Sequence, residues 1–376
     1  TLSHKRWVLR KDELLVRYRL SKPIYKELVM TIVVLKLQDV KRETEARPKK
    51  CPYCEGRTFQ RWGKVNKPVK DVRVRNVKVY RYRCCHCQRS FRGYPEGISR
   101  ADQSERLKQF ATICWTLGLS HRGVSLILSG LQISLAHISI WRDVQTAAGQ
   151  RKKHNRKKSV RVLGLDGAYV LGWGEKQPVL VGVDMGDGQV VALGHVNEYD
   201  PAAVCRWLAG VVKQLGVSVI VSDDLHTYRI VAEKLNLGHQ VCQFHVRRWV
   251  GQALKELRKT VPKEWQWVLD EIDQLIEALP SQGDRRLYAL WKQLKVRRSG
   301  TGKPLSALDQ LRSLLLRLSQ HWQSYCTFQY EPQVPWTNNA TERAIGQMKM
   351  RARTVRAYKS WPGMHNGLLI TGTLTA

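Results

Sequence analysis

Acidic residues are scarce in this 376-residue sequence: 31 Asp and Glu stand against 64 Lys and Arg, so the formal net charge is +33. An excess of this size is larger than solubility requires and attracts a polyanion, which makes nucleic acid the expected partner. The same composition excludes a disordered chain, because 43% of the residues are hydrophobic, more than disorder at this charge allows. The length predicts two or three folded units.

Long hydrophobic runs are also missing. Near the start of the sequence the longest uncharged apolar run is Leu28–Leu35, well short of the roughly 20 residues that span a membrane. No signal-peptidase site follows this run. We therefore expect a soluble intracellular protein without a membrane partner, cytoplasmic and associated with the nucleoid in a prokaryote, or nuclear in a eukaryote.

Four of the nine cysteines form two pairs with the spacing C-x-x-C. The pairs flank residues 72–82, where apolar and basic residues alternate in the pattern of a strand with one charged face. Two such pairs joined by strands predict a zinc ribbon, in which four thiolates close a tetrahedral site. Unrelated reduced cysteines are the alternative, which the paired spacing disfavours. The expected ligands of one structural Zn²⁺ are Cys51, Cys54, Cys84 and Cys87.

Helical spacing of apolar residues begins at Ser104. Glycines at 118 and 130 separate three predicted helices, the last capped by Ser134 and running to Thr146. A short helix, a glycine turn and another helix resemble a helix-turn-helix, although a plain helical bundle has the same pattern. The neighbouring ribbon and the charge favour DNA binding. Residues 151–161 then hold seven basic residues and no acid, which is typical of a solvated linker that here also contacts phosphate.

Two aspartates mark the ends of predicted strands in the second half of the sequence. An apolar strand ends at Asp166, a hairpin follows over 178–196, and after a helix capped by Asp200 a buried strand ends at Asp223. With one more helix and strand, this is the element order of an RNase H-like α/β fold. A carboxylate at the end of an apolar strand is costly unless a cation neutralises it. A divalent metal is therefore expected there, and a simple capping or turn aspartate is the alternative.

Four stretches, taken in order, resemble DDE transposases of the mutator-like and related insertion-sequence group. They are Asp166-Gly167, Ser222-Asp223-Asp224, Cys242-Gln243-Phe244-His245 and Thr337-Asn338-Asn339-Ala340-Thr341-Glu342-Arg343. The resemblance covers roughly residues 48–376. It implies an enzyme that binds the terminal inverted repeats of a mobile element and catalyses strand cleavage and strand transfer.

The resemblance implies that Asp166, Asp223 and Glu342 are catalytic and bind two Mg²⁺ ions, for which Mn²⁺ can substitute. Such ions lie about 4 Å apart and act on the attacking and leaving oxygens. The middle acid is Asp223 or Asp224, and the position directly after the strand favours Asp223. The C-x-x-H stretch supplies only two of the four ligands that zinc usually requires, so we expect it to be structural.

The combined domain interpretation has six parts. They are a basic segment without assigned structure (1–47), the zinc ribbon (48–98), the helix-turn-helix (99–150), the first part of the RNase H-like core (159–245), an α-helical insertion (246–331) and the last part of the core with the catalytic Glu (332–376).

Double-stranded DNA, as transposon ends and target, is the predicted partner, and two ends imply a homodimer or a larger assembly. The leading alternative is a catalytically inactive, transposase-derived DNA-binding regulator. An RNA-processing nuclease is weaker, because nothing resembles an RNA-binding module. The residues expected to contact DNA are Arg142, Lys152, Lys153, Lys157, Lys158, Asn338, Asn339, Arg343, Lys349, Arg351 and Arg353.

Overall fold

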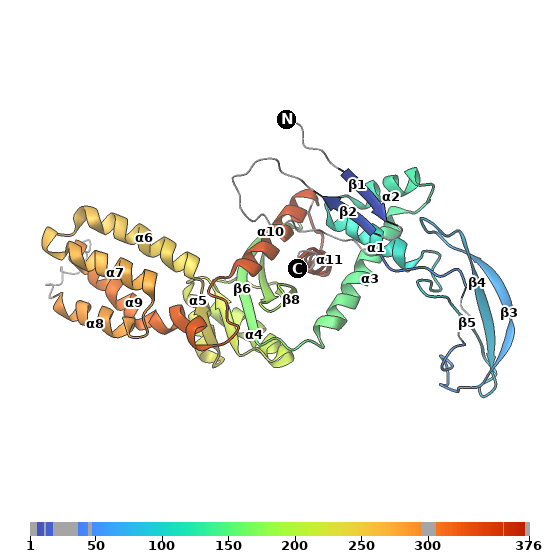
Figure 1. Cartoon of the computed structure of the whole chain (residues 1–376), viewed down its shortest axis with the longest axis horizontal. Helices are drawn as coiled ribbons and strands as arrows, with labels where there is room; N and C mark the ends of the chain where they lie inside the picture. Colours follow the sequence, from blue (N-terminus) through green and yellow to red (C-terminus); the bar gives the residue numbers. More distant parts are fainter. Residues whose placement is uncertain are drawn as a thin grey trace. The chain divides into compact units, whose positions relative to one another are not determined.

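The computed structural model describes residues 6–10, 13–17, 37–43, 47–294, 306–355 and 357–372 (Figure 1). The chain divides into two compact units, Thr1–Thr146 and Ala147–Ala376. Among the described residues, no helix is both long enough and apolar enough to cross a membrane.

Two antiparallel sheets lie in the first unit. The strands β1 (Arg6–Arg10) and β2 (Glu13–Arg17) form a hairpin, in a segment for which the sequence predicted no structure. The second sheet has the order β3-β4-β5, with β3 (Phe59–Pro68), β4 (Asn76–Cys84) and β5 (Ser90–Gly93). Apolar and polar residues alternate along β4, so the side chains of Val77 and Val79 point into a small apolar core. Strands β3 and β4 lie between the cysteine pairs, where the sequence predicts a ribbon, and β5 follows the second pair. The zinc ribbon itself stays a prediction.

Three helices follow: α1 (Glu105–Thr116), α2 (His121–Gly130) and α3 (His137–Asn155), of which α3 begins in the first unit and ends in the second. The first begins after Ser104, whose hydroxyl accepts a hydrogen bond from the Leu107 N–H at 3.0 Å. The buried faces of the three helices share one apolar cluster. They are the elements predicted for a helix-turn-helix.

The third helix differs from its predicted bounds. It begins three residues after Ser134 and continues past Thr146 to Asn155, so it includes the first part of the basic run expected to be a linker. Lys, Arg, Gln and Ala, which dominate this stretch, are all favourable in helices. The buried Asn155 amide also donates to the Val190 carbonyl at 3.1 Å, which fixes the end of the helix.

The sheet of the second unit has the order β10-β9-β6-β7-β8. Strands β6, β7 and β8 are consecutive and antiparallel, whereas β9 pairs parallel to β6 and β10 parallel to β9. This topology confirms the predicted RNase H-like α/β fold. The strands are β6 (Val162–Gly172), β7 (Glu175–Asp184), β8 (Val190–Gly194), β9 (Val219–Ser222) and β10 (Gly238–Val241).

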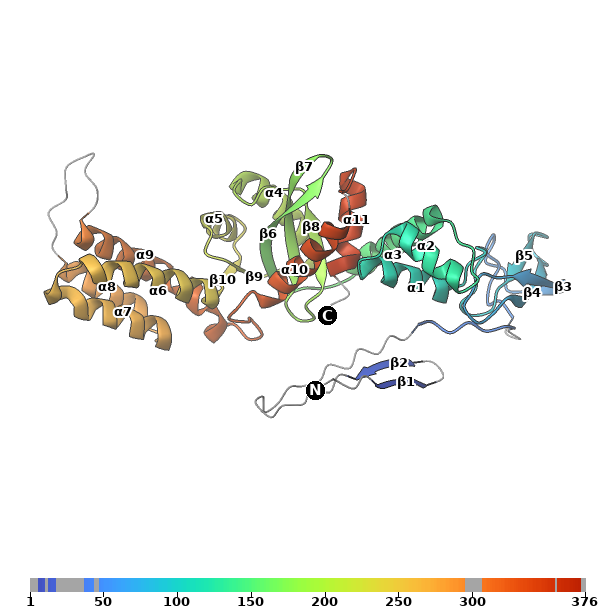
Figure 2. The same ribbon diagram turned by 90° about the horizontal axis from the view of Figure 1, so that it is seen from above.

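Helices cover both faces of this sheet (Figure 2). One face packs against α4 (Pro201–Leu215) and α5 (His226–Lys234), and the other against α10 (Asn339–Thr354) and α11 (Trp361–Gly372). The predicted cap of α4 is present, because the Asp200 carboxylate accepts from the Ala202 and Ala203 N–H groups at 3.0 Å.

A group of helices lies between β10 and α10 in the sequence and forms its own apolar core (Figure 2). This is the predicted helical insertion. Its regular elements are α6 (Gln243–Thr260), a short 3-10 helix η1 (Lys263–Trp265), α7 (Gln266–Ala278), α8 (Gly283–Gln293) and α9 (Ala307–Tyr330).

Candidate active site

Asp166 and Asp223 lie where two neighbouring strands part. β9 pairs with β6 only as far as Gly164, two residues before Asp166, and Asp223 directly follows the last residue of β9. The expectation that β6 ends at Asp166 is wrong: the strand continues to Gly172, because Asp166 and the residues after it still pair with β7. The loss of the β9 neighbour, not the end of β6, opens space beside Asp166.

Two glutamates approach these aspartates. Glu342, in the first turn of α10, and Glu198, in the loop between β8 and α4, both raise the pKa of Asp166 through their charge. Glu198 packs directly against the strand, since a Cβ added at Gly167 would lie 2.2 Å from its carboxyl carbon. The Tyr228 hydroxyl donates to Glu198 at 3.1 Å. The sequence analysis missed Glu198, which follows a strand by four residues and carries no motif.

Burial and mutual repulsion dominate the electrostatics of this carboxylate cluster. Burial, followed by the charge of Asp223, raises the pKa of Asp166 to about 7. Burial also raises the pKa of Asp223 and of Glu198. Within the described ranges, no lysine or arginine forms an ion pair with Asp166, Asp223 or Glu198. Oxygen ligands that repel one another fit a divalent cation such as Mg²⁺, which would neutralise them.

Asp224 is adjacent to Asp223 but, unlike it, has cationic partners. Its carboxylate forms ion pairs with Arg229, which is buried, and with Arg317 at 2.6 Å. The two ion pairs already neutralise Asp224, although it lines the same hollow as Asp223. Its carboxylate therefore does not need a metal ion for neutralisation.

A hollow of about 530 Å³ adjoins Asp223 and Asp224. Asp223, His245, Arg248, Trp249 and Arg317 are among the side chains that line it. The Arg317 guanidinium lies 4.2 Å from the centre of the Trp249 ring. This arrangement brings cationic groups from the helical insertion to within reach of a phosphate bound beside Asp223. No sequence pattern singles out Arg248 and Arg317, because many other arginines also occupy exposed helix positions.

We expect the protein without added Mg²⁺ or Mn²⁺ to lose stability as the pH rises from about 4 to about 7. The folded Asp166 keeps its proton up to a pKa of about 7, whereas the unfolded carboxyl releases it near the ordinary value of 3.8. Folding therefore takes up a proton in this window, and the free energy of unfolding falls as pH rises. The contribution is on the order of 4 kcal/mol at most.

Thermal unfolding measured from pH 4 to pH 8 tests this expectation. Asp166→Asn is the matched control, because its side chain cannot ionise, and its profile should be flatter than that of the wild type. Added Mn²⁺ should restore wild-type stability above pH 7. Parallel pH profiles for the two proteins would contradict the assignment of a raised pKa to Asp166.

The residues expected to contact DNA divide by their surroundings. Asn338 and Arg351 are 2% and 3% exposed, so their side chains face the interior and are not presented to a duplex. Lys158 forms ion pairs with Asp184, at 2.6 Å, and with Asp187. Lys152 is partly buried, which lowers its pKa. The others are exposed: Arg142, Lys153, Lys157, Asn339, Arg343, Lys349 and Arg353.

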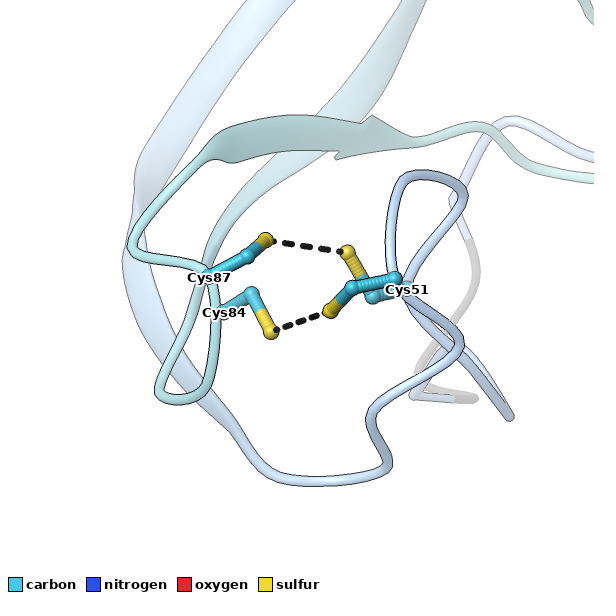
Figure 3. Close-up of side chains that lie close together, drawn as sticks. Cys51, Cys84 and Cys87 are labelled. Carbon is cyan, nitrogen blue, oxygen red and sulfur yellow. Dashed lines mark hydrogen bonds between the residues drawn. The ribbon is translucent and has the colours of Figure 1, made fainter.

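The four predicted zinc ligands come together at one end of the ribbon. Their sulfurs all lie within 4.8 Å of one another, with 3.7 Å between Cys51 and Cys87 and 3.6 Å between Cys54 and Cys84. Figure 3 shows the labelled Cys51, Cys84 and Cys87 with their side chains pointing toward a common centre. A tetrahedral zinc with bonds of about 2.3 Å requires sulfurs about 3.8 Å apart. The cluster therefore fits a zinc ion.

Comparison with known proteins gives one family match. Residues 203–366 match the model of the IS66 family of transposases, a DDE family. This region includes Asp223, His245 and Glu342, whereas Asp166 and Glu198 precede it. The mutator-like group stays a prediction. No curated protein matches the chain.

Two solved structures are similar at low identity. The catalytic core domain of BIV integrase is 14% identical, over 43% of this chain and 83% of that chain, with a TM-score of 0.19. A simian T-cell lymphotropic virus intasome in complex with the PP2A regulatory subunit B56 gamma is 13% identical, over 60% of this chain and 76% of that chain, with a TM-score of 0.20. The family match is the more specific finding: residues 203–366 are similar to the transposase-family model.

Proposed function

We propose that this protein is a DDE transposase that binds the ends of a mobile DNA element and catalyses metal-dependent strand cleavage and strand transfer. The observation that carries the proposal is that Asp223 and Glu342 lie close enough to Asp166 for their charges to raise its pKa. Asp223 and Glu342 also lie within the residues that match the transposase-family model. The absence of ion pairs to Asp166 and Asp223 among the described residues supports a metal-binding role over a structural one.

In this proposal Asp166, Asp223 and Glu342 hold divalent metal ions, Mg²⁺ or Mn²⁺. When bound, such ions activate the attacking oxygen and stabilise the leaving oxygen of a phosphodiester. The three carboxylates, which come from separate segments of the chain, would hold these ions beside the reacting phosphate. The Arg248 and Arg317 side chains, which line the adjoining hollow, bind and orient the flanking backbone phosphates.

DNA recognition is assigned to the first unit and to the exposed basic residues. The ribbon and the three helices α1–α3 bind the element ends, with Arg142 on the exposed face of α3. The net charge of +33 supports a large contribution from phosphate contacts. Because an element has two ends, we propose a homodimer or a larger assembly on DNA.

Cleavage of a labelled duplex that carries the element's own end sequence tests the function. We expect strand cuts at the element end when Mg²⁺ or Mn²⁺ is present. No cuts are expected in buffer without divalent ions. A random duplex of equal length is the control and should not be cut at a defined position. Tight and sequence-specific binding without cleavage in either metal would favour the inactive DNA-binding regulator instead.

A further inference from the structure

Two hydrogen bonds hold the segment before α10 to the start of α6, and a third joins α6 to α10 itself. The Asn338 N–H donates to the Cys242 sulfur at 3.3 Å, and the Gln243 N–H donates to the Trp336 carbonyl at 2.9 Å. At the next turn His245 Nε2 lies 3.0 Å from a Glu342 carboxylate oxygen. A carboxylate only accepts, so His245 Nε2 carries the proton and donates it. The C-x-x-H stretch thus contacts both the cap of α10 and its glutamate.

The same segment is fixed on its other side to the strand that carries Asp166. The Asn338 side-chain amide donates to the Leu165 carbonyl at 2.9 Å, and the Thr341 hydroxyl donates to the Asn338 amide oxygen at 2.6 Å. The approach is close: a Cβ at Gly164 would lie 2.2 Å from the Thr341 hydroxyl oxygen. Asn338 therefore connects the strand of Asp166 with the helix of Glu342.

Burial distinguishes the parts of this arrangement. Cys242, Asn338 and Thr341 are at most 2% exposed, whereas the side chains of His245 and Glu342 are 36% and 39% exposed. The buried residues fix the backbone at the start of α10, but they leave the Glu342 side chain free to rotate at the solvent boundary. The hydrogen bond from His245 restricts that rotation.

We propose that His245 and Cys242 are positioning residues that hold Glu342 for metal binding, an inference that rests on the proposed function. Cys242 fixes the cap of α10 through Asn338, and His245 orients the carboxylate itself. Hydrogen-bonding partners of metal ligands affect metal affinity because a ligand held in place loses less entropy on binding. This role explains why a cysteine and a histidine lie three residues apart at the start of α6.

A transition-metal site is the competing explanation, since ligand atoms of Cys242, His245 and Glu342 all lie within 4.8 Å of one another. Two observations favour the positioning role. The described residues supply three donors there, one fewer than a structural zinc site uses. The Cys242 sulfur is also fully buried and already accepts the Asn338 N–H.

The test compares His245→Ala, His245→Gln and Cys242→Ala with the wild type, and Cys205→Ser on α4 serves as the matched control. Two titrations with Mn²⁺ are made: one follows cleavage of end DNA, and the other follows the rise in melting temperature of the protein without DNA. We expect His245→Ala to need about 10- to 100-fold more Mn²⁺ in both titrations. His245→Gln, whose amide nitrogen reaches a similar position, should recover most of this loss.

Cys242→Ala should shift both titrations in the same direction, and Cys205→Ser should shift neither. Unchanged Mn²⁺ midpoints in His245→Ala would overturn the proposal. So would a second zinc per chain in the wild type that Cys242→Ala removes. If the wild type does not cut DNA, the proposed function fails, and the melting titration alone still decides whether His245 and Cys242 support metal binding.

Discussion

We expect Asp223→Asn to abolish DNA cleavage. Asp224→Asn should still cleave DNA at temperatures at which this variant is folded. Asp223 lies beside Asp166 without a cationic partner among the described residues, and its ionised form is needed to hold a metal. Loss of a metal ligand removes several kcal/mol of transition-state stabilisation, which corresponds to a rate loss of at least about 10³-fold. Asp166→Asn and Glu342→Gln should behave in the same way.

Stability should change in the opposite sense. Asp223→Asn removes a repulsive charge from a buried cluster, so the metal-free variant should be at least as stable as the wild type. Asp224→Asn leaves the buried Arg229 without its carboxylate, which costs about 3–5 kcal/mol for a buried pair. Cleavage rates and melting temperatures of the two variants therefore separate chemistry from folding.

DNA affinity provides the control for both variants. Because phosphate contacts are made by basic side chains elsewhere, each variant should bind end DNA within a few-fold of the wild type. An inactive Asp224→Asn protein that is folded, together with an active Asp223→Asn protein, would show that the metal ligand is the other aspartate. Normal cleavage by all of the carboxylate variants would show that these acids do not form the active site, and the proposed mechanism would fail.

The succession of strands and helices in the second unit, and the place of Asp223 directly after a strand, could be predicted from the sequence because both depend on local patterns. Alternating or continuous apolar runs define β6 to β10, and Asp200-Pro201 is a local helix start. The end of β6 could not be predicted, because it depends on pairing with β7, a contact between different parts of the chain. Propensity alone does not reveal which partner a strand keeps.

Burial of polar residues was the other part that local patterns could not predict. Asn338 follows a proline and a tryptophan and precedes a helix, which is equally typical of an exposed cap. Its amide instead bonds to Leu165, a residue 173 positions earlier in the sequence. Glu198 is similar, because its place beside Gly167 follows from packing of the loop before α4 against β6. Long-range packing decides such cases, and a single sequence does not encode it in any local motif.

The zinc predicted for the ribbon leads to the second large effect. Few buried apolar side chains support this sheet: Val69, Val74, Val77, Val79 and Ile98 form its cluster, and Tyr82 packs against Phe59 and Phe91. Such a small core stabilises little by itself, so small domains commonly rely on a metal.

The two cysteine pairs have matching backbones, since Glu55 and Gln88, each directly after its pair, have φ of 58° and 59°. Backbone N–H groups of Cys87 and His86 help lower the pKa of Cys84 to about 6, which favours the thiolate that zinc binds.

Cys84→Ser should therefore remove zinc and unfold the ribbon, while the second unit, with its separate cores, stays folded. Structural zinc in small domains contributes about 10–16 kcal/mol of apparent binding free energy, so the loss is expected to be complete. Elemental analysis should give one zinc per chain in the wild type and none in the variant, and limited proteolysis should then degrade residues 48–98 first. Cys85→Ser is the matched control, because Cys85 is exposed and outside the cluster, and it should keep both zinc and the ribbon. Zinc-free wild-type protein purified without chelator, or equal zinc loss in the two variants, would show that the four sulfurs do not form a metal site.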